Sequence, residues 1–323
     1  MSSELIIVVS KYLYIYLGLF LGSVGSIGNL LTISTFVGLK NYRSLPSSTF
    51  LAGSALGEQL VLLSSAFPDS LTYMSGYDFY GTSVSMCKST SFLYFAGGVI
   101  ALTCMYLAAI DRYLQTCRSA ARREWMTLYT ARLLVFLAIL VSSGISVPFA
   151  IYRNVTPDYQ LCQYVNSIFK RIASLMYAIV GVPMPIILLS VFGFLTWHNL
   201  KASSQHQRSR LVTHQLNQQV ARMILIQTSM VVVSVLPASL LQAYFLTTGK
   251  GSQGVTVADK FLLCTTQLLL YAHSCASFYV YLLVSPTFRR RVKIMLCLKQ
   301  FHSTRVVAFT LQTNATRMQT IIS

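Results

Sequence analysis

The sequence has few charged residues and very few acidic ones. Only 10% of its 323 residues are charged, against roughly a quarter in a typical soluble domain, and 8 Asp and Glu stand against 25 Lys and Arg. This shortage excludes an ordinary soluble fold. The net charge of +17 could suggest nucleic-acid binding, but the basic residues form short clusters between apolar runs, and we expect no nucleic-acid partner.

Other absences exclude further classes of protein. No nucleophile and base occur in a supporting context, and no Cys or His cluster has metal-ligand spacing, so we expect no enzyme, metal site or cofactor. No repeat relates the two halves, and Glu58 is the one ionisable residue in its apolar run, which makes a transporter or channel less favoured. The short segment 1–11 contains no glycosylation sequon, and we expect no large ectodomain there.

Apolar runs dominate the sequence, of which 54% is hydrophobic. About 20 apolar residues at 1.5 Å each cross the roughly 30 Å of a bilayer's hydrocarbon core. The first run is too long for a cleavable signal peptide. We therefore predict an all-α bundle of seven transmembrane helices over residues 12–284. The predicted spans are 12–38, 47–71, 89–110, 131–152, 172–197, 223–247 and 261–284.

Lysine and arginine indicate the orientation of the bundle. Most of the 25 basic residues fall on the inner side if the N-terminus is extracellular, as the positive-inside rule requires. Basic and apolar residues alternate after Pro286, which predicts a short amphipathic helix over 285–299 on the membrane surface, followed by a cytoplasmic tail at 300–323. Cys297 in that helix is a candidate for palmitoylation.

The cysteines favour one disulfide bond. Five of the seven lie in apolar runs or on the reducing inner side: Cys104, Cys264, Cys275, Cys117 and Cys297. Cys87 and Cys162 remain for a bridge on the outer side. Asn154 lies in an Asn-x-Thr sequon in the same outer segment as Cys162, which predicts glycosylation.

Two polar residues interrupt apolar runs. Asn29 follows Gly22, Gly25 and Gly28, and a lone amide in lipid needs a partner on a neighbouring helix. A structural and a functional role stay open for Asn29. Glu58 is costly at mid-membrane, so we expect it to face the bundle interior and to bind water, a cation or a proton.

These residues together resemble the rhodopsin-like (class A) G-protein-coupled receptors over about residues 12–299, and among them neuropeptide receptors. Cys87 precedes Arg112 by 25 residues, as in that family. The matching elements, in chain order, are Gly28-Asn29, Ser54-Ala55-Leu56-Gly57-Glu58, Cys87, Asp111-Arg112-Tyr113, Cys162, Pro237, Ser277 to Tyr281, and Phe288-Arg289-Arg290.

The resemblance implies a plasma-membrane receptor that signals through a heterotrimeric G protein. An agonist shifts the helices toward an arrangement in which Arg112 leaves Asp111 and the inner ends of the fifth and sixth spans separate. The G protein then enters beside Arg112. The residues implied in this switch are Asp111, Arg112, Tyr113, Pro237, Ser277 and Tyr281, and those of the polar site inside the membrane are Asn29, Glu58 and Ser277.

Several positions depart from the family's pattern. Glu58 replaces an aspartate, and Ala101 replaces the serine that helps that aspartate to hold a sodium ion. Asn217 stands where an acidic partner of Arg112 is usual, which predicts ligand-free activity. These changes leave open a non-signalling, scavenging or orphan receptor as the alternative. Further departures are Ala138 or Ile139, Gly193, Val235 and Ser277-Phe278.

The resemblance also limits the ligand. Tyr94 stands where amine receptors have an aspartate, and Tyr271 where light receptors have a lysine. We therefore expect an extracellular peptide or small molecule, with a short basic or amidated peptide favoured by outer acids and aromatic residues. The acids are Asp69, Asp78, Asp158 and Asp259, and the residues implied in the ligand pocket are Tyr94, Gly98, Tyr244 and Tyr271.

Overall fold

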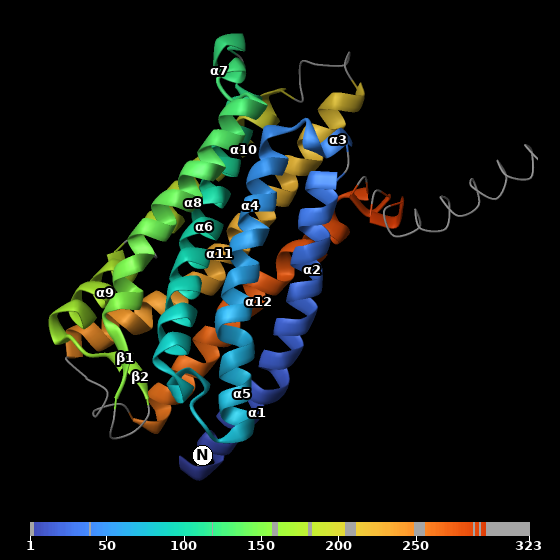
Figure 1. Ribbon diagram of the computed structural model, residues 1–323. Coiled ribbons are helices and arrows are strands. Elements are labelled where there is room, and N and C mark those ends of the chain that lie inside the picture. The colour runs from blue at the N-terminus through green and yellow to red at the C-terminus, as the bar shows by residue number, and fades with distance from the viewer. Residues whose placement is uncertain are drawn as a thin grey trace, which may run out of the picture.

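The computed structural model describes residues 3–38, 40–117, 119–156, 161–179, 183–203, 211–248, 256–286, 288–290 and 292–294. In these residues, long helices lie side by side in one bundle (Figure 1). The helices are α1 Ser3–Tyr12, α2 Leu19–Gly38, α3 Lys40–Arg43, α4 Pro46–Val61, α5 Phe67–Ser75, α6 Val84–Thr116, α7 Ala120–Glu124, α8 Leu128–Ile151, α9 Ser167–Ile179, α10 Pro183–Ser203, α11 Leu211–Thr248 and α12 Val257–Val284. The strands are β1 Arg153–Val155 and β2 Cys162–Tyr164.

The prediction of an all-α membrane bundle is confirmed. Among the described residues, six helices are long and apolar enough to cross a bilayer. The predicted fifth span, 172–197, falls on α9 and α10, where Ile187–Asn199 is a shorter apolar helix. The six long spans are Glu4–Gly38, Pro46–Ser75, Val84–Thr116, Leu128–Ile151, Arg222–Phe245 and Val257–Val284.

The helix of the second span does not end at Pro68 but continues through it. A π-helical segment, Leu62–Ala66, joins α4 to α5, and Pro68 lies in the first turn of α5, where its missing N–H is tolerated. The helix ends instead at Gly76, whose φ of 77° is a left-handed C-cap that favours glycine.

Helix α6 lies inside the bundle and packs most extensively against α4 and α8, with further contacts to α10 and α11. Gly57 of α4 lets the backbones of α4 and α6 approach closely. A Cβ atom at Gly57 would lie 2.5 Å from both the Ala101 nitrogen and the Gly97 oxygen, closer than real Cβ atoms come. Glycine is therefore required at this crossing.

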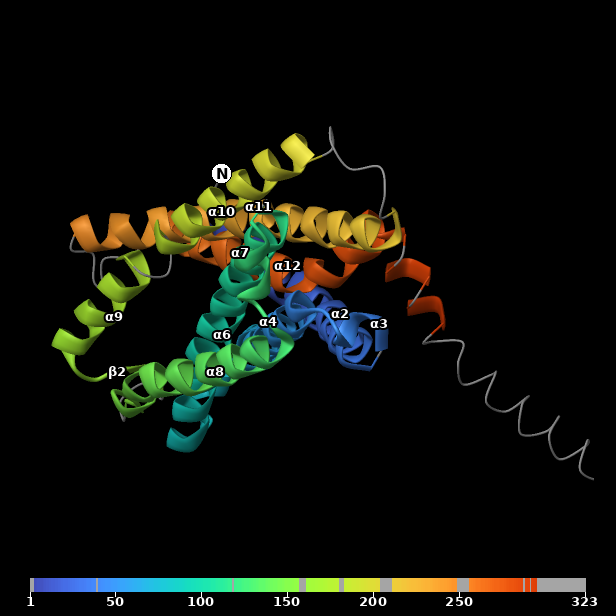
Figure 2. The ribbon, with the colours of Figure 1, turned by 90° about the horizontal axis from the view of Figure 1, so that it is seen from above.

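A two-stranded hairpin closes one end of the bundle. Strands β1 and β2 pair antiparallel with Val155 opposite Cys162, and a disulfide bond joins Cys162 to Cys87 in α6, as the sequence predicted. The hairpin and the N-terminus lie at the same end, which we call the outer end, while α3 and α7 lie at the opposite, inner end (Figure 1). Seen from above, α9 lies across the bundle from α2 and α3 (Figure 2).

Apolar side chains both fill the bundle and cover its outside. The larger buried cluster includes Phe36, Phe50 and Tyr281, and a second one includes Tyr14, Leu62 and Tyr271. Many other large apolar residues are exposed, as expected for a surface that contacts lipid. Among them are Phe20, Ile27, Leu30, Phe136, Leu140, Val141, Val233 and Leu240.

The predicted amphipathic helix after the seventh span is described in part. Residues 286, 288–290 and 292–294 are helical, and Phe288 is buried with its ring 5.7 Å from that of Tyr281. Ser285 is the C-cap of α12, and residues 287, 291 and 295–299, Cys297 among them, lie outside the described part of the chain. Palmitoylation of Cys297 stays a prediction.

The close approach of α4 and α6 is testable by adding one methyl group. Gly57→Ala should destabilise the bundle by about 1–3 kcal/mol, because the methyl meets backbone atoms that cannot rotate away. Thermal unfolding of the purified protein in lipid nanodiscs measures the effect. Gly144→Ala is the matched control, since a Cβ there meets no atom within 4 Å. Equal unfolding temperatures for the two variants would contradict this packing.

Candidate functional site

The basic residue of the Asp-Arg-Tyr triplet is enclosed at the inner end of α6. Arg112 is 2% exposed, and its Nη2 atom forms an ion pair with Asp111 Oδ2 at 3.0 Å and donates a hydrogen bond to Ser47 Oγ. Because Ser47 belongs to α4, this contact ties two helices together. A guanidinium buried in this way is not accessible to a partner at the inner surface.

A second polar contact joins α6 to α10 at the inner end. Asn199 Nδ2 donates to Thr116 Oγ1 at 3.4 Å, and the ring of Tyr113 lies 5.7 Å from that of Phe192. The fifth-span segment and α6 are thus held side by side. The side chain of Asn217, in α11, lies outside the described side chains, so the prediction based on it stays a prediction.

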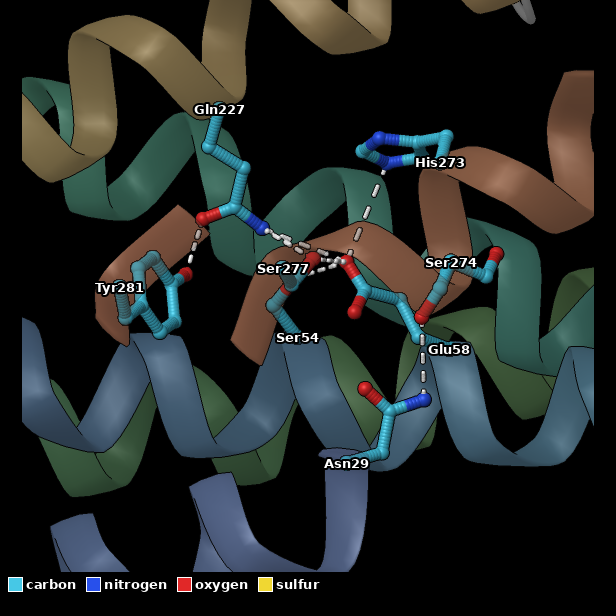
Figure 3. A network of polar contacts seen from close by, with 8 residues as sticks. All are labelled: Asn29, Ser54, Glu58, Gln227, His273, Ser274, Ser277 and Tyr281. Carbon is cyan, nitrogen blue, oxygen red and sulfur yellow. Dashed lines mark hydrogen bonds and ion pairs between the residues drawn. The ribbon is translucent and has the colours of Figure 1, made fainter. Parts of the chain in front are cut away.

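A polar network occupies the middle of the bundle (Figure 3). Its centre is Glu58 of α4, which is 1% exposed and whose Oε1 accepts hydrogen bonds from Ser277 at 3.1 Å and from Gln227 at 3.3 Å. Ser54, one turn earlier in α4, donates to the same oxygen at 3.4 Å. Glu58 therefore faces the bundle interior, and three helices meet at one of its oxygen atoms.

Gln227 of α11 connects this network across the bundle. Its Nε2 donates to Ser277 Oγ at 3.0 Å and to Glu58, and its Oε1 accepts a hydrogen bond from the Tyr281 hydroxyl. One amide thus links α11 to both α4 and α12. Sequence reasoning missed Gln227, although an amide in an apolar segment is the signal that singled out Asn29.

Asn29 and His273 lie beside the network. Asn29 Nδ2 donates to the carbonyl oxygen of Ser274 at 3.2 Å, which gives α2 the partner on a neighbouring helix that the sequence required. His273 Nε2 lies 3.9 Å from Glu58 Oε1, too far for a hydrogen bond, and its buried Nδ1 has no partner among the described residues. Sequence reasoning did not single out His273.

Binding of a cation, a proton or water by Glu58 stays a prediction. A hard cation is held by several oxygen atoms. Glu58 Oε1 accepts three hydrogen bonds, one of them from the amide nitrogen of Gln227, while Glu58 Oε2 and Asn29 Oδ1 are buried and have no hydrogen-bond partner in the described part of the chain. Ala101 offers no side-chain oxygen. Among the described residues, no group of three His, Cys, Asp or Glu could hold a metal ion. The arrangement suits a carboxyl group held by hydrogen bonds.

A cavity of about 320 Å³ opens at the outer end, beneath the hairpin. Two charged residues line it, Asp69 of α5 and Arg153 of β1. The rest of its lining is polar and aromatic, together with Leu263 and the disulfide. The other lining residues are Tyr14, Ser64, Ser65, Tyr80, Thr90, Ser91, Tyr94, Phe95, Cys162, Leu263 and Gln267.

Among the residues implied in ligand binding, Tyr94 lines this cavity. Tyr271 is fully buried, and its hydroxyl donates to Asp69 Oδ2. Gly98 and Tyr244 do not line the cavity, and Tyr244 is partly exposed, 5.6 Å from the ring of Phe245. Ligand contact by these residues stays a prediction.

The outer acids are used within the protein. Both oxygens of Asp78 accept backbone hydrogen bonds, one from Tyr80 at 3.1 Å and one from Cys162 at 3.2 Å. Asp259 completes a capping box with Thr256 at the start of α12. Asp158 lies outside the described residues. Asp69 is thus the one described outer acid that lines the cavity.

The predicted glycosylation site is accessible. Asn154 is exposed in β1, at the outer end, and its Oδ1 accepts a hydrogen bond from Val155 N at 3.0 Å. This placement is compatible with a sugar chain on its amide nitrogen. Glycosylation of Asn154 stays a prediction.

Comparison with known proteins gives the family. Residues 28–281 match the family model "7 transmembrane receptor (rhodopsin family)". The chain is 23% identical over 290 residues to bombesin receptor subtype-3 of Ovis aries, an alignment that covers 85% of this chain and 72% of that receptor. It is 28% identical over 143 residues to the gastrin/cholecystokinin type B receptor of Canis lupus familiaris, an alignment that covers 44% of this chain and 30% of that receptor.

The matched region contains the buried polar network, the enclosed arginine and both disulfide cysteines. It extends over most of the chain, from Gly28 in α2 to Tyr281 in α12. The protein therefore belongs to the rhodopsin family of seven-transmembrane receptors, and it is a multi-pass membrane receptor rather than an enzyme.

Proposed function

We propose that this receptor recognises a short peptide at its outer end and activates a heterotrimeric G protein at its inner end, around Arg112. The enclosure of Arg112 by Asp111 and Ser47 is the observation that carries the proposal, because it corresponds to a resting state that an agonist must open. Two relatives whose names state receptors for peptides support the peptide ligand.

The proposed activation is a population shift between two helix arrangements. In the closed one, Gln227 ties α11 to Glu58, Ser277 and Tyr281, and Arg112 is covered. In the open one, α11 moves outward, these hydrogen bonds exchange for water, and Arg112 turns toward the G protein. An agonist favours the open arrangement only by the difference in its affinity for the two.

The amide of Gln227 supplies a second restraint besides the Arg112 ion pair. Because Asn217 stands where an acidic partner of Arg112 is usual, the sequence indicated no second ion pair for Arg112 and predicted ligand-free activity. Each hydrogen bond of Gln227 is worth about 1 kcal/mol. We propose that ligand-free activity depends on how firmly these contacts hold α11, and that it is measurable in the native receptor.

Removing the Gln227 contacts should activate the receptor. Gln227→Leu loses three hydrogen bonds that exist in the closed arrangement, so agonist-free nucleotide exchange should rise about tenfold. The measurement is GTPγS binding by purified receptor with each G-protein class. Thr228→Val is the matched control, because that neighbouring hydroxyl is buried and has no partner among the described residues. Exchange that falls, or rises equally in the control, would count against the restraint.

The role of Arg112 is tested in the same activated background. Gln227→Leu with Arg112→Ala should reduce exchange to the level without receptor, because no guanidinium remains for the G protein. The control replaces Arg112→Ala by Arg222→Ala in the same background. Arg222 is exposed in the inner part of α11, so this double variant should retain most of the signal. A double variant that still signals would contradict the proposed role of Arg112.

The same assay decides between signalling and the alternative of a silent or scavenging receptor. The departures at Ala101, Val235 and Ser277 favour that alternative. If neither the native receptor nor Gln227→Leu promotes exchange on any G-protein class, the proposed coupling is overturned and the silent or scavenging receptor is favoured.

A further inference from the structure

Asp69 and Arg153 are the two charged residues that line the outer cavity. They differ in whether their hydrogen-bonding atoms are already bound within the protein. Asp69 Oδ1 accepts a hydrogen bond from the Tyr80 hydroxyl at 2.5 Å, and Asp69 Oδ2 accepts one from Tyr271. Burial and the Asp69 carboxylate raise the pKa of the Tyr80 phenol above its ordinary value, so this phenol stays protonated and donates. Both oxygens of the one acid in the cavity are thus already bound.

Arg153 keeps unused donors. Its Nη1 donates to Ser91 Oγ at 3.0 Å, while its Nε is buried and has no hydrogen-bond partner in the described part of the chain. No carboxylate forms an ion pair with it among those residues. Asp69 lies close enough to interact with Arg153 electrostatically, but it forms no ion pair with it, so the guanidinium that lines the cavity can still form a charge-assisted hydrogen bond with an anion.

The hairpin holds this guanidinium in a fixed place. Arg153 pairs with Tyr164 across the two strands, and its guanidinium carbon lies 4.9 Å from the centre of the Tyr164 ring. Cys162 lies on the same face of β2 as Tyr164, two residues before it, and is joined to α6 by the disulfide bond. A donor that is already positioned loses little conformational entropy when it binds.

The size of the cavity limits what can enter. Its volume of about 320 Å³ is at the low end of the roughly 300–1,000 Å³ of ligand sites, so it accommodates one end or one side chain of a peptide. Hydroxyl and amide groups of Thr90, Tyr94 and Gln267 line it beside Arg153. These groups are neutral, so they do not compensate the positive charge of Arg153.

We propose that this cavity binds a carboxylate of the ligand through the guanidinium group of Arg153, which lines it. The proposal rests on the proposed peptide-receptor function and reverses one expectation from the sequence, that of a basic or amidated ligand. A peptide can supply the carboxylate either as its free C-terminus or as an Asp or Glu side chain. Both present the same planar pair of oxygen atoms to the guanidinium.

The test uses the full-length receptor in nanodiscs and four probes. The first is a short-peptide library with free C-terminal carboxylates and no Asp or Glu, and the second is the same library amidated. The third is an amidated library with one Asp or Glu in each peptide. The fourth is N-acetylphenylalanine, compared with its carboxamide. Thermal stabilisation of the receptor reports binding.

At least one carboxylate-bearing library should stabilise the native receptor, with about tenfold higher apparent affinity than the amidated library without acids. Arg153→Gln should abolish the difference, and Arg153→Lys should retain part of it. Arg171→Gln, in an exposed arginine of α9 outside the cavity, should behave as native. The comparison of probes on native receptor holds even if an Arg153 variant does not fold.

The outcomes separate the two proposals. Equal stabilisation by amidated and carboxylate-bearing libraries, or a preference that survives Arg153→Gln, overturns the carboxylate site and leaves the peptide function standing. Stabilisation by N-acetylphenylalanine but by no peptide library supports the carboxylate site and overturns the peptide function. Absence of stabilisation by all four probes overturns both.

Discussion

A carboxyl group buried between lipid-spanning helices is the constraint on which the rest of the structure depends. Glu58 has no access to bulk water in the middle of the bundle, so its polar atoms need partners on other helices. Ser277 and Gln227 supply them for Oε1 from α12 and α11, while Oε2 has no hydrogen-bond partner in the described part of the chain. Hydrophobic packing alone does not specify which helices meet at this depth, whereas these hydrogen bonds do.

Helix α12 connects this centre to both ends of the receptor. Tyr271 binds the acid of the outer cavity, Ser277 binds Glu58, and Tyr281 binds Gln227 and packs beside Phe36 and Phe288 at the inner end. A ligand that shifts the outer part of α12 therefore acts on a helix that also holds the inner contacts. Because these hydrogen bonds are discrete, the proposed activation is a change between two arrangements rather than a continuous movement.

Sequence patterns predicted what depends on local chemistry. Apolar runs located the helices, and elimination among the cysteines located the Cys87–Cys162 bond. The partners of polar side chains could not be predicted in the same way, because Asp69 is bound by a tyrosine 202 residues away. For that reason the sequence suggested a free outer acid and a basic ligand. Gln227 was missed because it matches no family motif, although an amide in an apolar run had already singled out Asn29.

The distance between the inner ends of α3 and α11 tests the central claim most directly. Labels at Arg43→Cys and Arg222→Cys, in a Cys297→Ser background, report it by double electron–electron resonance in nanodiscs without ligand. We predict one short-distance population in the native receptor and an added longer-distance population when Gln227→Leu is present, with Thr228→Val unchanged. A distribution in Gln227→Leu identical to that of the native receptor would show that the amide does not hold the bundle closed.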